Sequence, residues 1–152
     1  LEDEGICCQD VMDRLNDNLV DGICVTAVYE NGTKIKYLKY LKCEIEMHYD
    51  GCISDTTEDR INSLFQQSEL LMEKKGKNGL ARQNIIPMIQ SLNVTRLDAH
   101  ALRICAVISC QEPSLNPSQI SSAVAKYLPD CLPDDVRCRR CELYDASGQV
   151  FR

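Results

Sequence analysis

The sequence predicts an all-α fold of about six short helices, cross-linked by up to five disulfides and followed by an irregular C-terminal tail. The ten cysteines in 152 residues form an even set, as in small disulfide-stabilised domains. Apolar residues recur mainly at spacings of three and four, the period of one helix face. Aromatic residues are few, with six Tyr, two Phe and no Trp, so we expect an aliphatic core. The length fits one disulfide-rich helical domain over residues 1–152.

The N-terminal third is expected to hold two helices. In residues 7–21 an apolar side chain recurs at every fourth position, and Gly22 follows as a residue that ends helices. The β-branched stretch 24–30 runs into Asn31-Gly32, which by itself favours a hairpin. The apolar residues that follow have helical spacing instead: Ile35, Leu38, Leu41, Ile45 and His48. We therefore predict a second helix of about four turns there, with Asn-Gly as the loop before it.

Four further helices are expected, at residues 57–75, 80–92, 96–109 and 117–128. Each has one apolar side. In the basic stretch KKGKNG, Gly76 and Gly79 are expected to end the first of them. Asn116 followed by Pro117 is a strong start signal for the last. Residues 129–152 contain two prolines and three cysteines, which predicts an irregular, disulfide-tied tail.

The cysteines and two glycosylation motifs together predict a secreted, extracellular protein. Asn31 and Asn93 each begin an Asn-x-Thr motif and are glycosylation candidates. In an oxidising compartment all ten cysteines are expected to pair, although their connectivity cannot be deduced: Cys7, Cys8, Cys24, Cys43, Cys52, Cys105, Cys110, Cys131, Cys138 and Cys141. No apolar run approaches the ~20 residues of a membrane span, so no membrane insertion is expected.

Charge and spacing argue against several other classes. The net charge of −6 predicts no nucleic-acid binding, because a phosphate backbone would repel the chain. Cys138 and Cys141 have a spacing found in structural zinc sites, but the even cysteine count and the sequons favour disulfides. We expect neither a metal nor another cofactor. The lysines between residues 34 and 42 alternate around their predicted helix, which favours a solvated face over a heparin-binding patch.

The stretch CEIEMHYDGC, residues 43–52, invites comparison with a hydrolytic site. His48 lies two residues before Asp50 and close to Cys52, superficially as in secreted phospholipases A2. No glycine-rich loop precedes them, so nothing would bind the Ca²⁺ that stabilises an oxyanion. His100 also lacks an evident nucleophilic partner. We therefore predict no enzymatic activity and expect His48 to complete the apolar side of its helix.

Part of the cysteine pattern is similar to that of the atypical, cysteine-enriched insect odorant-binding proteins. Cys43 and Cys52 are separated by eight residues, like the last cysteine pair of that family, and Cys24 opens a segment that reaches Asn31-Gly32. Val28 stands where the family's Cys-x3-Cys step would place a cysteine, so the resemblance covers architecture and not motif order. It implies a helical shell around an odorant, a pheromone or a lipid-like molecule.

These observations predict a non-enzymatic carrier that buries a small hydrophobic molecule in a helical cavity. Ligand contacts are expected at Phe65, Leu71, Ile85, Met88, Ile89, Leu102 and Val107. The same apolar stripes can pack into a solid core instead. The alternative function is a secreted signalling, venom or recognition factor that acts through its surface on a receptor protein. A homodimer is compatible with either function.

Overall fold

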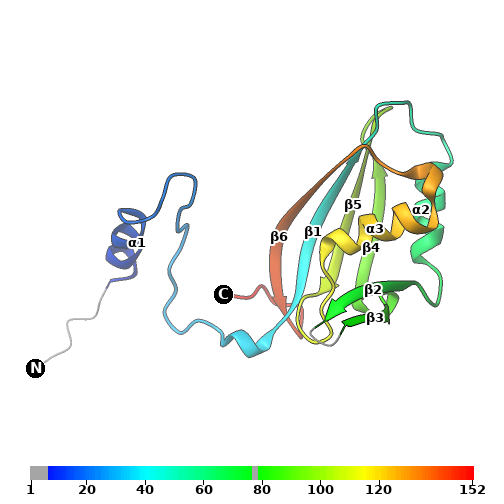
Figure 1. Cartoon of the computed structure of the whole chain (residues 1–152). Coiled ribbons are helices and arrows are strands. Elements are labelled where there is room, and N and C mark those ends of the chain that lie inside the picture. The colour runs from blue at the N-terminus through cyan, green and yellow to red at the C-terminus, as the bar shows by residue number, and fades with distance from the viewer. Residues whose placement is uncertain (1–6, 77–78) are drawn as a thin grey trace, which may run out of the picture. The chain divides into compact units, whose positions relative to one another are not determined.

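The computed structural model describes residues 7–76 and 79–152, in two compact units. The first unit comprises residues 1–35 with Arg152, and its helix α1 spans Cys8–Asn16 (Figure 1). The Asn16 side chain closes the loop that follows, because its Nδ2 donates to the Val25 carbonyl (3.1 Å) and its Oδ1 accepts from the Val25 amide (2.7 Å). The helix predicted over residues 7–21 thus ends earlier than expected, at Asn16. The second unit comprises residues 36–151.

The second unit combines helices and antiparallel sheets, so the all-α prediction is wrong. Its main sheet has the strand order β4-β5-β1-β6. The strands are β1 (Leu38–His48), β4 (Ile89–Arg96), β5 (Ala101–Ser109) and β6 (Asp135–Asp145). A separate hairpin pairs β2 (Leu71–Gly76) with β3 (Gly79–Asn84). The helices are α2 (Thr57–Phe65) and α3 (Pro117–Tyr127), with short 3-10 turns at Ile86–Met88 and Pro129–Cys131. A further 3-10 turn, Ile35–Tyr37, begins at the last residue of the first unit.

The chain follows a ferredoxin-like topology. Its main elements run β1-α2-β4-β5-α3-β6, with the β2–β3 hairpin inserted between α2 and β4. This is the βαββαβ arrangement of that fold class. Helices α2 and α3 lie against the same face of the main sheet (Figure 1). The opposite face is not covered by any helix of this unit.

The helix-covered face and the two helices enclose one aliphatic core. Along β1, Cys43, Ile45 and Met47 are completely buried at alternate positions. The core also includes residues of β5, α2 and α3: Leu102, Ile104, Ala106, Ile108, Ile61, Leu64, Phe65, Ile120, Ala123 and Val124. Because successive strand side chains point to opposite faces, the polar residues between the buried ones belong to the uncovered face.

The helix predicted from Ile35 to His48 is mostly strand β1, because its apolar residues alternate. Cys43 and Met47 fill the buried positions that the helical pattern left out. Cys43 was expected to form a disulfide and so was not included among the apolar core residues. Free cysteine is common in such buried positions.

The helices predicted at 57–75, 80–92 and 96–109 need the same correction. The first ends at Phe65, and its second part is strand β2. The other two predicted ranges lie mainly in strands β3, β4 and β5. The KKGKNG stretch joins β2 to β3 and does not end a helix; its residues 77–78 lie outside the described part of the chain.

The C-terminal segment 129–152 is not the irregular tail that its prolines suggest. After the turn at Pro129–Cys131 it forms β6, an edge strand that pairs along the length of β1. A register shift between Lys42 and Cys43 marks a bulge in this pairing.

No disulfide is formed, so the predicted cross-linking is wrong: all ten cysteines are free thiols. Cys43 and Cys131 are buried in the core. Burial raises the pKa of the Cys43 thiol to about 12, with further contributions from the neighbouring Cys138, Cys141 and Cys105. Cys43 and Cys131 contribute through packing, and the fold is held by its core and its sheet.

Helix α3 confirms the predicted helix at 117–128 and its start at Asn116. The Asn116 Oδ1 accepts from the Ser118 amide (3.1 Å), and the Gln119 Oε1 accepts from the Asn116 amide (3.2 Å). We expect Asn116→Ala to lower the free energy of unfolding by about 1 kcal/mol, because it removes the cap acceptor. Urea denaturation measures this. Asn116→Asp keeps an acceptor, and an equally large loss in that control would contradict the role of the cap.

Candidate binding face

The uncovered side of the main sheet gathers polar and charged side chains. Residues directly opposite one another on antiparallel strands point to the same side, so the strand register defines this surface, which we call the open face. Its members are Ser91, Asn93 and Thr95 on β4, Arg103, Cys105 and Val107 on β5, Lys42, Glu44, Glu46 and His48 on β1, and Asp135, Arg137, Arg139 and Glu142 on β6.

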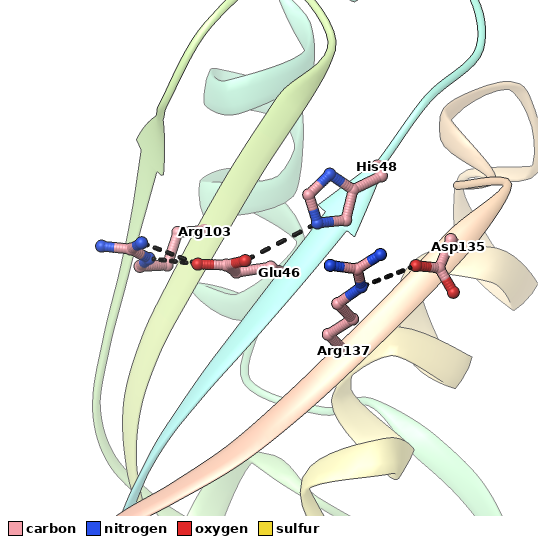
Figure 2. A network of polar contacts seen from close by, with 5 residues as sticks. All are labelled: Glu46, His48, Arg103, Asp135 and Arg137. Carbon is pink, nitrogen blue, oxygen red and sulfur yellow. Dashed lines mark hydrogen bonds and ion pairs between the residues drawn. The ribbon is translucent and has the colours of Figure 1, made fainter.

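A chain of three charged or titratable side chains crosses the open face from β5 to β1. Arg103 donates twice to Glu46 Oε1, from Nε (3.1 Å) and from Nη2 (2.6 Å). The other carboxylate oxygen, Oε2, lies 3.6 Å from His48 Nε2. Figure 2 shows the Glu46 carboxylate between the guanidinium and the imidazole. His48 Nε2 is inaccessible to solvent and has no hydrogen-bond partner among the described residues, so Glu46 is its nearest charged neighbour.

These contacts fix the charges of Glu46 and Arg103. The hydrogen bond from Arg103 lowers the pKa of the Glu46 carboxyl, and the nearby charges of Arg103 and His48 lower it further, although burial opposes them. The same hydrogen bond raises the pKa of the Arg103 guanidinium. At neutral pH the pair therefore consists of a carboxylate and a guanidinium, which act as fixed charges and not as proton donors.

A second ion pair lies on the edge strand β6. The Arg137 Nε donates to Asp135 Oδ2 at 3.0 Å, and both side chains are largely exposed (Figure 2). An exposed pair of this kind contributes little to stability, typically ~0–1 kcal/mol. Arg137 can therefore turn to another anion at little energetic cost.

Glu44 and Arg139 are opposite charges that do not pair. They are direct partners across β1 and β6, yet within the described chain neither side chain makes a hydrogen bond or an ion pair. Glu44 contributes only a longer-range effect that raises the pKa of Arg103. Between them lies a shallow hollow of about 280 Å³, lined by Glu44, Glu46, Arg103, Arg137, Cys138 and Arg139. We call it the charged hollow.

The other end of the open face is aromatic. Tyr40 and Tyr144 are direct partners across β1 and β6. They line a second hollow of about 410 Å³ together with Gln90, Val107 and the turn at residues 146–148. That turn is held by Asp145, whose carboxylate accepts from the Ser147 amide (2.8 Å), the Ser147 hydroxyl (2.7 Å) and the Gln149 amide (3.0 Å). The open face thus changes from charged to aromatic along β1.

The seven residues predicted to contact a ligand do not surround a cavity. Phe65, Ile85, Met88 and Leu102 are buried in the core, and Ile89 packs against it. Phe65 and Ile89 also line one small hollow of about 200 Å³. Leu71 is half-buried on β2, and Val107 lies on the open face beside Tyr40. The apolar stripes therefore form a packed core, and the predicted helical cavity is wrong.

Sequence reasoning missed the five charged residues that line the charged hollow: Glu44, Glu46, Arg103, Arg137 and Arg139. The available signal was the alternation of Lys42, Glu44, Glu46 and His48 with apolar residues, which is the pattern of a half-buried strand. His48 was assigned to an apolar side but lies on this polar one. Its nearest charged partner is Glu46 and not Asp50. Among the described residues, no three His, Cys, Asp or Glu side chains are grouped as metal ligands.

A family model matches most of the chain. Residues 1–117 match a model described as "Uncharacterized protein conserved in bacteria (DUF2344)". No curated protein matches the chain.

This match overturns the resemblance to insect odorant-binding proteins, because the matched family is bacterial. The predicted secreted, glycosylated carrier and the alternative secreted receptor ligand are wrong for the same reason, since both were argued from disulfides and sequons. The ten thiols are free. Asn93, one of the two glycosylation candidates, lies on strand β4, where its Nδ2 donates to Thr95 Oγ1 at 3.0 Å. No described helix is long and apolar enough to cross a membrane.

Proposed function

We propose that this chain, which belongs to the bacterial family DUF2344, is a binding module that holds a small zwitterionic molecule on its open face. The molecule carries a carboxylate and an ammonium group, as free α-amino acids do. Because one fold class hosts many functions, the proposal rests on the site alone. The observation that carries it is that Glu44 and Arg139 lie directly opposite each other in the lining of the charged hollow and that neither has a partner within the described chain.

Arg139 supplies the position for the carboxylate. A guanidinium presents several N–H donors in a plane and binds a carboxylate through two parallel hydrogen bonds. Arg139 makes no such bond within the described chain. Arg137 lines the same hollow, and its pairing with Asp135 is exposed and weak, so it can add a second donor to the ligand.

Glu44 supplies the position for the ammonium group. Opposite charges at directly facing strand positions stabilise a sheet when they pair, but these two remain apart. A ligand with both charges can bridge them, giving each side chain a partner. Glu46 is already neutralised by Arg103, but Glu44 would repel a purely anionic ligand beside it, and the net charge of −6 disfavours polyanions. The expectation that the chain binds no nucleic acid agrees with this proposal.

The surroundings keep the hollow in place, and its volume indicates the size of its occupant. Arg103 donates two hydrogen bonds to one oxygen of Glu46, and this pair connects β5 to β1 beside Glu44 and Arg139. A volume of about 280 Å³ lies just below the usual range for small-molecule sites, roughly 300–1,000 Å³. It suits a molecule of amino-acid size.

Binding and not catalysis is the proposed role. Glu46 and Arg103 neutralise each other's charge, and the solvent-inaccessible His48 Nε2 faces Glu46. A general acid or base must reach the proton it transfers, and none of these three groups offers a proton to a molecule in the hollow. The charged side chains of the hollow bind the ligand and orient it.

Calorimetric titration with individual free α-amino acids tests the proposal. Arg139→Gln and Glu44→Gln are each expected to weaken binding by about tenfold or more, since a hydrogen bond to a charged group contributes ~1.5–3 kcal/mol. Arg140→Gln is the matched control. It makes the same charge change on the next residue, which pairs with Cys43 and so belongs to the other side of the sheet.

Blocked ligands test the two charges separately. N-acetylated amino acids should lose the contact with Glu44, and amino acid methyl esters should lose the contact with Arg139. The proposal is wrong if no free amino acid binds, if the blocked forms bind as tightly, or if Arg140→Gln weakens binding as much as Arg139→Gln.

A further inference from the structure

Two loops far apart in the sequence are joined at the end of the sheet where β1 stops. One is residues 49–56, between β1 and α2, and the other is the turn 97–100, between β4 and β5. The Tyr49 amide donates to the His100 carbonyl (2.9 Å), and the Ile53 amide donates to the Ala99 carbonyl (2.8 Å). These two bonds hold the loops side by side.

Each loop contributes one reactive side chain to the junction. The Cys52 Sγ lies 4.0 Å from the His100 Nε2, and both residues are exposed. The other ring nitrogen, His100 Nδ1, lies 3.1 Å from the Gly51 carbonyl oxygen. A carbonyl oxygen only accepts hydrogen bonds, so Nδ1 carries the hydrogen. In the neutral ring, Nε2 then has a free lone pair directed towards the thiol.

The junction is fixed on both sides of the pair. The Asp98 Oδ1 accepts from the His100 amide at 2.7 Å. Arg96 Nη1 pairs with Asp55 Oδ1 at 2.9 Å, and Nη2 of the same guanidinium donates to the Ile53 carbonyl. The arrangement is that of an activated nucleophile: a thiol, a base within reach, and a third group that orients the base. Such pairs are often separated by more than a hydrogen-bond length before a reactant arrives.

We propose that Cys52 is a nucleophilic thiol with His100 as its base, and that it exchanges with low-molecular-weight disulfides to give a reversible mixed disulfide. This site is independent of the charged hollow. His100 Nε2 accepts the proton of Cys52 Sγ, and the thiolate attacks one sulfur of the small disulfide. A new S–S bond forms to Cys52 as the S–S bond of the reagent breaks. The departing thiolate takes the proton from the His100 imidazolium, so one thiol and one disulfide are consumed and one of each is produced.

The choice of Cys52 among ten cysteines follows from its partner. The chain has two histidines, and among the described contacts Cys52 is the cysteine within reach of an imidazole. Cys7, Cys24, Cys138 and Cys141 are also exposed, so exposure alone does not distinguish it. They serve as internal controls in the same molecule.

The test uses the reduced full chain and a substoichiometric amount of the aromatic disulfide 5,5′-dithiobis(2-nitrobenzoate) at pH 7. Peptide mass mapping then locates the first label. We expect Cys52 to react about tenfold faster than Cys24 or Cys141, because an unassisted thiol is only a few per cent thiolate at this pH. Cys52→Ser should abolish the fast phase of thiol release. His100→Gln keeps a donor for Gly51 but removes the base, and it should slow Cys52 to the rate of Cys24 while Cys24 itself is unchanged.

Circular dichroism and the rate at Cys24 show whether His100→Gln remains folded. If that variant unfolds, Asp98→Ala is the substitute, because it loosens the His100 backbone without removing either reacting group and should slow Cys52 selectively. The proposal is overturned if Cys52 reacts no faster than Cys24 in the wild-type chain. It is also overturned if a folded His100→Gln variant retains the fast phase.

Discussion

Replacing Ile45 with alanine is expected to lower the free energy of unfolding by about 2–5 kcal/mol. Ile45 is completely buried in the middle of β1 and faces Ile104 of β5 across the sheet. Removing three carbons from this position loses their transfer free energy and leaves a cavity, because the sheet cannot close around it. Urea denaturation followed by circular dichroism gives the change, and an unchanged m-value would show that the same fold unfolds.

Ile35→Ala is the matched control for this substitution. Ile35 is 68% exposed, so the same change of side chain should alter stability by no more than about 0.5 kcal/mol. Equal effects at the two positions would contradict the placement of Ile45 in the core. They would also contradict the assignment of residues 38–48 to strand β1.

Alkaline pH is expected to destabilise the protein through Cys43. Burial raises the pKa of this thiol from 9.0 to about 12, so between these values the unfolded chain releases a proton that the folded chain retains. The contribution of Cys43 is thus fully present below pH 9 and is lost as the pH rises towards 12. Burial also raises the pKa of Tyr49 to about 12, which adds to the loss above pH 10.

Unfolding free energies measured from pH 8 to 11 in a phosphine reductant test this expectation. Stability should fall with rising pH in the wild-type protein and fall less steeply in Cys43→Ala. The comparison uses the slope of the unfolding free energy against pH and not its absolute value, because the alanine variant also loses packing. Tyr49→Phe should flatten the upper part of the curve independently. Identical slopes in wild type and Cys43→Ala would mean that Cys43 is not a buried free thiol.

Helix α3 was predictable because its signals are local. Asn116 and Pro117 mark its start within two residues, and its apolar side has the period of a helix. Strand β1 was not predictable in this way, because its buried side chains include Cys43 and Met47. The sequence predicts a disulfide partner at Cys43, and methionine is common in helices and strands alike. The spacing of the remaining apolar residues then imitated a helix.

The cysteine count misdirected both the fold and the location of the protein. An even number of cysteines favours disulfides only where the compartment is oxidising, and nothing in the residues themselves reports the compartment. Cys43 and Cys131 serve as small apolar core residues. The same composition is therefore compatible with a disulfide-tied shell and with a sheet packed on helices.

Neither site could be read from the sequence, because each depends on contacts between distant segments. Glu46 and Arg103 are 57 positions apart, and Cys52 and His100 are 48 apart. The antiparallel register of β1 with β5 brings Glu46 to Arg103, and backbone hydrogen bonds between the two loops beyond it bring Cys52 to His100. The sequence did single out the stretch from Cys43 to Cys52. Its histidine proved to be a partner of Glu46, and its last cysteine has the other histidine of the chain as its neighbour.

The most direct test of ligand binding in the charged hollow is to record the NMR signals of the arginine Nε–H groups as free α-amino acids are added. The proposed binding predicts that the signals of Arg137 and Arg139 shift in a saturable way while that of Arg140, on the other side of the sheet, stays in place. Shifts of all three together, or of none, would contradict the assignment of the open face as the binding surface.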